Sequence, residues 1–186
     1  MDAKLSTQTM ILHTTKEILS QTASVHPDIV SIDAPLSLPK GRKSLAARYR
    51  NGPHFRSCDL ELRRMKIPFF PVTLGPMRSL TRRGIRLRKI IEAQGVRVIE
   101  GYPGGVQDVL GMPRKSKGLE KLREALIRYG CSGDVAKPGV THHELDAVTC
   151  SLVGKMVLDG NYLAIGNPDE GLMYLPKPMV DQTISS

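Results

Sequence analysis

The chain has 186 residues, of which 40% are hydrophobic and 24% charged, an ordinary globular composition that favours one domain with one sizeable core. Its formal net charge of +9 favours a polyanionic partner such as nucleic acid. No apolar run reaches the roughly 20 residues that span a bilayer, and the N-terminus lacks a signal-peptide pattern, so we exclude a membrane protein and expect a cytoplasmic one.

The N-terminal part of the chain predicts a strand, a helix and a second strand. Residues 9–13 form a candidate strand. Thr14 is placed to cap a helix, and Glu17, three residues later, completes a capping box ahead of apolar residues. Residues 28–33 are a compact β-branched run that is closed by a proline, which fits a buried strand.

The middle of the chain is irregular and then becomes regular again. Residues 35–78 are broken up by proline and glycine, which leaves one short helix near residues 59–65. A long connection of this kind is usually functional or mobile. Residues 80–95 predict an amphipathic helix with a C-terminal glycine, and residues 96–100 predict a second short strand before the turn-rich GYPGG.

The C-terminal part predicts two helices and a hairpin. The helices cover residues 117–130 and 141–160, and a small hairpin joins residues 162–166 to 171–176. Strands separated by helices favour an α/β fold whose sheet is at least partly parallel. Such sheets place their chemistry beyond the carboxyl ends of the strands.

Two strands run into an acidic residue. Asp33 follows one strand and Glu100 ends the other, and each is followed by a proline within three residues. Both are therefore expected at the carboxyl edge of the sheet, where they are candidates for metal binding or catalysis. The structural alternatives are an Asx turn for Asp33 and a solvated strand end for Glu100.

A third acid has an unusual place on a helix. Asp146 lies roughly opposite the solvated face that holds Glu144, because each helical step turns about 100°. If Asp146 is buried, its carboxylate requires a cation, a metal or strong hydrogen bonds. If the first turn of the helix is exposed, the charge of Asp146 only interacts favourably with the helix dipole. Glu144 completes a capping box with Thr141, and His143 stands three residues before Asp146, as a polar helix end, a metal ligand or a proton carrier.

Convergence of these residues would suit metal-dependent chemistry. The three cysteines form no C-x-x-C pair, so any metal would have to be held by oxygen ligands or His. Asp33 and Asp146, with Glu100 or His143, would suit two Mg²⁺ or Mn²⁺ ions for phosphodiester hydrolysis, because hard cations prefer carboxylates.

The positive charge is concentrated in one region. Sixteen lysines and arginines lie between Lys40 and Arg97, together with only three acids. Within it, Arg82, Arg86 and Lys89 share one face of the predicted helix and are candidates for contacts to a phosphate backbone. The alternative is a solvated basic surface without a partner.

An ordered set of motifs resembles an uncharacterised prokaryotic family of predicted RNase H-like nucleases. The resemblance extends over about residues 14–176. Its motifs, in chain order, are VSIDAPLSLP, RSCDLELRR, MRSLTRRGIRL, VIEGYPGGVQDVLG, KGLEKL and HELDAVTCSLVG. It implies a five-stranded mixed sheet with flanking helices, whose carboxylates bind two divalent metals.

The resemblance also implies roles for particular residues. It makes Asp33 and Asp146 active-site acids. His143 and Asp146 are similar to the metal-binding pair on the last core helix of some Holliday-junction resolvases. Asp59, in the RSCD motif, has no role that we derive from the sequence; together with Arg56 it is placed to order the long loop.

The N-terminus departs from the family pattern. Members usually begin with an apolar strand carrying G-I-D-x-A, whose aspartate is the central metal ligand, and this chain has none. The resemblance therefore implies that about one hairpin is absent, that a two-metal site is incomplete and that hydrolysis is in question. It also implies an open sheet edge, which invites a homodimer or a cover formed by the N-terminal segment.

The sequence thus predicts one RNase H-like α/β domain over residues 1–186, with an incomplete N-terminal hairpin and a basic irregular insertion around residues 35–78. The predicted function is that of a metal-dependent nuclease, or an inactive relative, acting on DNA or RNA. The alternative is a non-catalytic nucleic-acid-binding or assembly module. A phosphate-binding enzyme built on GYPGG is less favoured, because its glycines lack the required spacing.

Overall fold

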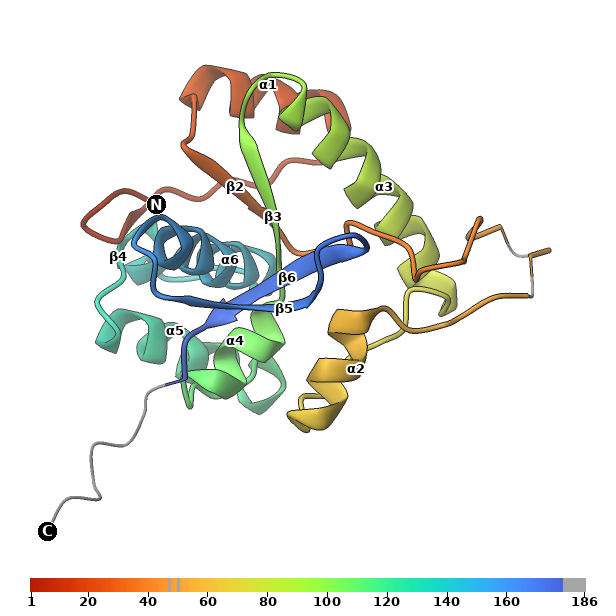
Figure 1. The fold of residues 1–186 in the computed structure, drawn as a ribbon. Coiled ribbons are helices and arrows are strands. Elements are labelled where there is room, and N and C mark those ends of the chain that lie inside the picture. The colour runs from red at the N-terminus through yellow and green to blue at the C-terminus, as the bar shows by residue number, and fades with distance from the viewer. Residues whose placement is uncertain (47, 50, 179–186) are drawn as a thin grey trace, which may run out of the picture.

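The computed structural model describes residues 1–46, 48–49 and 51–178, which form a mixed α/β fold (Figure 1). Its main sheet has the strand order β2-β3-β6-β5, in which β2, β3 and β6 run parallel and β5 is antiparallel to β6. The strands are β2 (Ile29–Ile32), β3 (Arg97–Gly101), β5 (Tyr162–Asn167) and β6 (Gly171–Pro176). The predicted partly parallel α/β sheet and its C-terminal hairpin are therefore confirmed.

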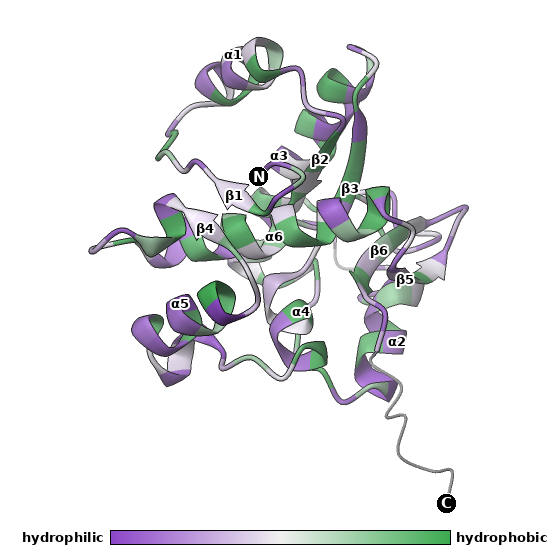
Figure 2. Ribbon diagram, turned by 90° about the vertical axis from the view of Figure 1, so that its left-hand side faces the viewer, coloured by the Kyte–Doolittle hydropathy of each residue, from purple (hydrophilic) through white to green (hydrophobic). Residues whose placement is uncertain are grey.

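The helices lie on both faces of this sheet. They are α1 (Thr15–Val25), α2 (Ser57–Arg64), α3 (Gly75–Glu92), α4 (Pro103–Val109), α5 (Leu119–Arg128) and α6 (His142–Leu158), with the short 3₁₀ turns η1 (Lys115–Lys117) and η2 (Asp134–Ala136). In Figure 1, α6 lies on one side of β3 and α3 on the other. Figure 2 shows α6 in the middle of the molecule and largely hydrophobic, whereas the peripheral α1 and α5 alternate between hydrophilic and hydrophobic residues.

Strand alternation divides the core between the two faces. On β3, Val98 packs in a cluster with Leu87 and Ile91 of α3, whereas its neighbour Ile99 packs with Val153 of α6. Successive side chains of a strand point to opposite faces, so this division fixes the face of every other residue on β3. The next residue on the α3 face is Glu100, and that placement decides its role below.

The helix starts were predicted correctly where capping residues mark them. Thr14 accepts the backbone N–H of Glu17 at the start of α1, and Thr141 accepts that of Glu144 at the start of α6, with both reciprocal glutamate bonds present. Each box satisfies N–H groups that the first helical turn leaves without partners.

Three local predictions were wrong. Residues 9–13 form no strand, because the Thr9 backbone N–H donates to the side chain of Asp134 instead of a neighbouring strand. The GYPGG segment is not only a turn: it begins α4, with Pro103 in the first turn, where a missing N–H costs nothing. α3 begins at Gly75 rather than at residue 80 because Pro76 starts a helix in the same way.

The N-terminal strand does not extend the main sheet. β1 (Ser6–Thr7) pairs in parallel with β4 (Ser132–Gly133) to form a separate two-stranded sheet, and β2 is an outer strand of the main sheet. A hollow of about 610 Å³ lies beside β2, between the N-terminal residues and α6. The open edge expected from the sequence is thus present at β2, and a homodimer across it stays a prediction.

Candidate functional site

Asp33 stands directly after β2, at its carboxyl end, as the sequence predicts. Strand alternation puts it on the same side as Ser31, two residues earlier, which faces α6 beside Cys150. The neighbouring strand has Gly101 there, and a Cβ atom at that position would lie 2.6 Å from the Ser31 hydroxyl and 3.1 Å from the Cys150 sulfur. Glycine is therefore needed for β2, β3 and α6 to meet closely beneath Asp33.

Asp146 lies in the second turn of α6 and is buried, with only 7% of its surface exposed. This confirms the prediction that it turns away from the solvated face of the helix. Its carboxylate accepts a hydrogen bond from the Lys115 ammonium of η1, in a salt bridge whose lysine is about half exposed. The cation that a buried carboxylate requires is therefore supplied by the chain itself.

The charge of Asp146 acts on Asp33. Protein atoms around Asp33 remove part of its hydration, and repulsion from Asp146 adds to this, so that together they raise the pKa of Asp33 to about 6. Lys115 offsets only part of the effect. Asp33 nevertheless keeps contact with solvent. We call Asp33 and Asp146, with Lys115, the open acid pair.

Glu100 lies on the other face of the sheet. In the register of β2 and β3 it is paired with Ile32, not with Asp33, so its side chain points toward α3 and the loop after β2. It is buried, and its carboxylate accepts two hydrogen bonds from Arg56 (2.7 and 2.8 Å) and one from the backbone N–H of Leu36 (2.7 Å). The alternative of a solvated strand end was therefore wrong, and the structure does not bring the Glu100 side chain to the same face as Asp33, as the sequence predicted.

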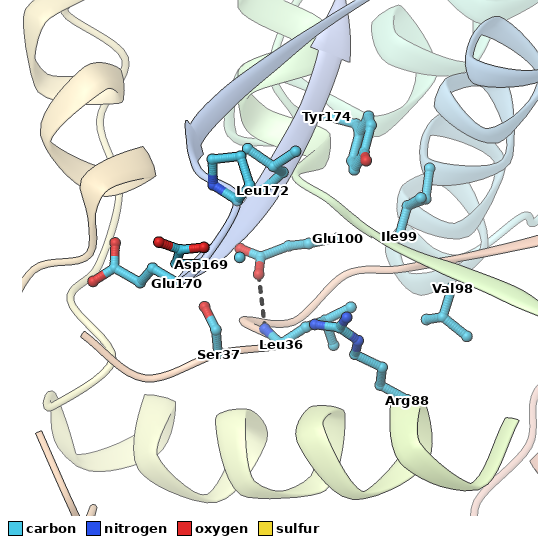
Figure 3. A pocket seen from close by; sticks show the side chains of 12 residues that line it. Leu36, Ser37, Arg88, Val98, Ile99, Glu100, Asp169, Glu170, Leu172 and Tyr174 are labelled. Carbon is cyan, nitrogen blue, oxygen red and sulfur yellow. Dashed lines mark hydrogen bonds between the residues drawn. The ribbon is translucent and has the colours of Figure 1, made fainter. Parts of the chain in front are cut away.

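Arg56 joins Glu100 to Asp59, and we call these three residues the closed acid cluster. The Arg56 guanidinium donates to Asp59 at 2.9 and 3.3 Å, and all three residues are at most 4% exposed. Figure 3 shows Glu100 directed at Leu36 within the wall of a small hollow of about 280 Å³. The predicted role of Arg56 and Asp59 in ordering the long loop is confirmed.

The structure places His143 on the surface. It is exposed, and its ring lies 3.9 Å from that of His142, measured between centroids. Glu144 is held by the Thr141 cap and by a hydrogen bond of 2.6 Å from the Thr9 hydroxyl. Sequence reasoning grouped His143 with the buried face of α6, but the first turn of the helix leaves it exposed to solvent.

The predicted basic face on α3 is present but turns away from Asp33. Arg82, Arg86 and Lys89 are all exposed. Gly84 packs against the residues that follow Asp33, where a Cβ atom would come within 2.9 Å of Ala34. The three cations lie roughly 140–160° around the helix from this contact.

Other basic residues, which sequence reasoning missed, lie nearer the open acid pair. Lys115 binds Asp146, and the adjacent Arg114 makes a two-bond ion pair with Asp108 and lies 6.0 Å from the ring centre of Tyr102. Burial raises the pKa of Tyr102, and the charge of Asp33 contributes to the rise, which places this ring near the acid. The sequence GMPRKSKG contains a run of basic residues, but nothing in it shows that one of them reaches α6.

The acid pair has a limited capacity for metal. Within residues 1–46, 48–49 and 51–178, no group of three or more His, Cys, Asp or Glu side chains is placed to hold an ion. Two carboxylates fit a Mg²⁺ ion that keeps several waters and takes further oxygens from a substrate phosphate. They do not fit a preformed two-metal centre. All three cysteines are free and buried, as expected for residues that only pack.

The fold and this site together define a mixed α/β protein with two carboxylates at the junction of a strand end and a helix. A family model described as "Protein of unknown function (DUF429)" matches residues 2–171, so the chain belongs to that family. This confirms the expected membership of an uncharacterised family. No curated protein and no solved structure matched the chain. No helix in the described part of the chain is long and apolar enough to cross a membrane.

Proposed function

We propose that this protein is a metal-dependent phosphodiesterase of the RNase H-like class that acts on nucleic acid. The observation that carries the proposal is the open acid pair. Two carboxylates from different elements lie close enough at the carboxyl end of β2 for the charge of Asp146 to raise the pKa of Asp33, and Asp33 stays accessible to solvent. Because the two carboxylates repel each other, a further positive charge would stabilise the site, and a divalent cation provides that charge.

Each residue of the pair has a distinct role in this proposal. Asp33, accessible and with a raised pKa, would bind the cation directly. Asp146, fixed by α6 and by Lys115, would supply the second carboxylate in a constant position. When bound, Mg²⁺ or Mn²⁺ would polarise the phosphate and lower the pKa of the attacking water.

Lys115 has two tasks in the same proposal. Its ammonium holds Asp146, and because about half of the side chain is exposed it can also meet a phosphate oxygen. Glu100 and His143 have none: the first belongs to the closed acid cluster and the second lies in solvent. The proposal therefore rests on fewer ligands than the sequence predicted.

Nucleic acid as the substrate is supported by charge. The net charge is +9, and the cations of residues 40–97 include the exposed face of Arg82, Arg86 and Lys89. Binding through phosphates predicts an affinity that falls steeply with salt. The substitutions Arg82→Ala and Arg86→Ala should weaken binding similarly for every sequence, and a salt-independent affinity would remove nucleic acid from the proposal.

Hydrolysis is tested with labelled oligonucleotides, both single-stranded and duplex, in Mn²⁺. We expect cleavage by the wild type and a loss of at least about 100-fold for Asp33→Asn and Asp146→Asn. Asp169→Asn, at the exposed turn of the C-terminal hairpin, is the matched acid control and should cleave normally. Equal cleavage by the wild type and both site variants would show that a contaminant or another site is responsible.

A non-catalytic nucleic-acid-binding or assembly module is the second candidate, and the Lys115 salt bridge favours it. That ammonium already neutralises Asp146, and neither Glu100 nor His143 completes a ligand set. Under this candidate the protein binds oligonucleotides in EDTA and in Mn²⁺ with the same affinity and cleaves neither.

A further inference from the structure

The segment between α2 and α3 presents an aromatic side chain to solvent in a basic surrounding. Phe70 is 68% exposed. Its neighbour Phe69 points the other way, packs against the main core cluster and makes an edge-to-face contact with Phe55, with ring centroids 5.9 Å apart. The segment is thus anchored by one phenylalanine while it displays the next.

The backbone on both sides of Phe70 is restricted. Pro68 and Pro71 flank the two phenylalanines and fix their own φ angles near −65°. The Tyr102 hydroxyl donates a hydrogen bond to the Pro68 carbonyl, which joins the segment to the residue after β3. An aromatic side chain on such a support loses little conformational entropy when it stacks against a ligand.

This anchor also sets where Phe70 lies relative to the proposed active site. Tyr102 directly follows Gly101, the glycine that lies beneath Asp33, and the Tyr102 hydroxyl donates a hydrogen bond to the Pro68 carbonyl. Phe70 is two residues further on, at most about 7 Å along the chain.

A second observation is independent of Phe70. Lys66, just after α2, has a φ of 59°, a left-handed conformation at which helices usually end with glycine. The cap is otherwise complete, since Ile67 donates its N–H to the Leu62 carbonyl at 2.9 Å. A lysine in this position adopts a strained backbone conformation, and its side chain is exposed four residues before Phe70.

The exposed basic residues that precede Phe70 indicate which kind of ligand it would bind. Arg63, Arg64 and Lys66 are exposed, and within the part of the chain that the structure describes no salt bridge neutralises them. Protein interfaces are depleted of charge at their centre, so this mixture favours a polyanion that has an aromatic face. In a duplex the base faces are already stacked, whereas in a single strand they are free to stack on an aromatic side chain.

We propose that Phe70 and Lys66 form a stacking platform for single-stranded nucleic acid, which guides the strand toward the open acid pair. Phe70 would stack on a base and Lys66 would meet the adjacent phosphate. As a description of the substrate this inference rests on the proposed function, but the platform can bind a strand whether or not hydrolysis follows.

The test is fluorescence polarisation in EDTA, so that cleavage does not intervene. The probes are labelled oligothymidylate and oligouridylate of about twelve nucleotides and a blunt duplex of the same length. We expect Phe70→Ala to weaken binding of the single strands about tenfold and to leave duplex binding unchanged, and Phe70→Trp to restore it. Tyr129→Ala, at another exposed aromatic just after α5, is the matched control and should have no effect. The two single strands distinguish DNA from RNA.

Lys66→Gly is a second test. Its expected result differs from the result expected if Lys66 had only a structural role. Glycine should relieve the backbone strain and raise the urea midpoint of unfolding, while it weakens single-strand binding about threefold through the lost phosphate contact. A variant that is more stable and binds equally well would remove Lys66 from the platform.

The outcomes separate this inference from the proposed function. Cleavage by the wild type with unchanged binding by Phe70→Ala would overturn the platform and leave the phosphodiesterase proposal standing. Selective loss of single-strand binding in a protein that cleaves nothing would support the platform and favour the binding-module candidate. An altered oligomeric state of Phe70→Ala on gel filtration, with unchanged binding, would assign Phe70 to a protein contact and also overturn the inference.

Discussion

The open acid pair and the closed acid cluster contain the same chemical groups, two carboxylates and one cation, but differ in how those groups are satisfied. Arg56 donates to both Asp59 and Glu100, and all three are buried. Lys115 donates to Asp146 only. Asp33 is repelled by the charge of Asp146 and keeps contact with solvent. The closed acid cluster stabilises the fold, whereas the open acid pair retains a negative charge to which a cation can bind.

Position in the fold explains this difference. The closed cluster lies on the α3 face of the sheet, where it fastens the long loop to β3 and where its three side chains are buried. The open pair lies on the α6 face, at the end of β2, where Asp33 keeps contact with solvent. Acids at the carboxyl ends of adjacent parallel strands can therefore be structural or functional according to the face that they share.

The largest expected effect is on stability, when each cation is replaced by a neutral amide. Arg56→Gln should lower the free energy of unfolding by about 3–5 kcal/mol, because it leaves two buried carboxylates without a cation. Lys115→Gln should cost only about 1 kcal/mol, since the lysine side chain is about half exposed and solvent screens the pair. Urea unfolding at neutral pH measures both, and equal costs would contradict the distinction between the clusters.

A smaller effect, of opposite sign, is expected for Asp33→Asn. Because the pKa of Asp33 is raised from 3.8 to about 6, the folded protein binds this proton more tightly than the unfolded chain does. The ionised carboxylate therefore lowers stability above pH 6, and this penalty disappears as the pH falls toward 4. Asp33→Asn should stabilise the protein at pH 7.5, by less than about 1 kcal/mol because Asp33 remains in contact with water.

This gain should shrink at pH 5, when urea unfolding is followed in EDTA for wild type and variant. A destabilising effect at pH 7.5, or a gain that does not depend on pH, would show that Asp33 is not held under repulsion. Increased stability together with lost activity is what a residue kept for function, and not for folding, should show.

Much of the fold follows from local signals in the sequence. Thr14 and Thr141 mark two helix starts through capping boxes, and the β-branched runs before Asp33 and Glu100 mark two parallel strands. The helical period also places Asp146 on a buried face. Each of these predictions depends on neighbours within a few residues, which is the range over which the sequence is directly informative.

The composition of the candidate site depends on long-range geometry, and there the sequence was less informative. Whether Glu100 joins Asp33 is decided by register: Glu100 pairs with Ile32, and a shift of one residue would have put both acids on one face. Lys115 reaches Asp146 from 31 residues away through a short 3₁₀ turn that has no periodic signal. An alternative strand register cannot be distinguished by composition or spacing alone.

The central claim is that the open acid pair, and not the closed cluster, binds a divalent cation. Electron paramagnetic resonance of free Mn²⁺, titrated with metal-free protein, measures this without any assay of activity. We expect about one Mn²⁺ per wild-type chain, as two carboxylates allow, with binding lost in Asp33→Asn and kept in Glu100→Gln and His143→Ala. Saturable binding that survives Asp33→Asn, or no saturable binding by the wild type, would contradict the claim.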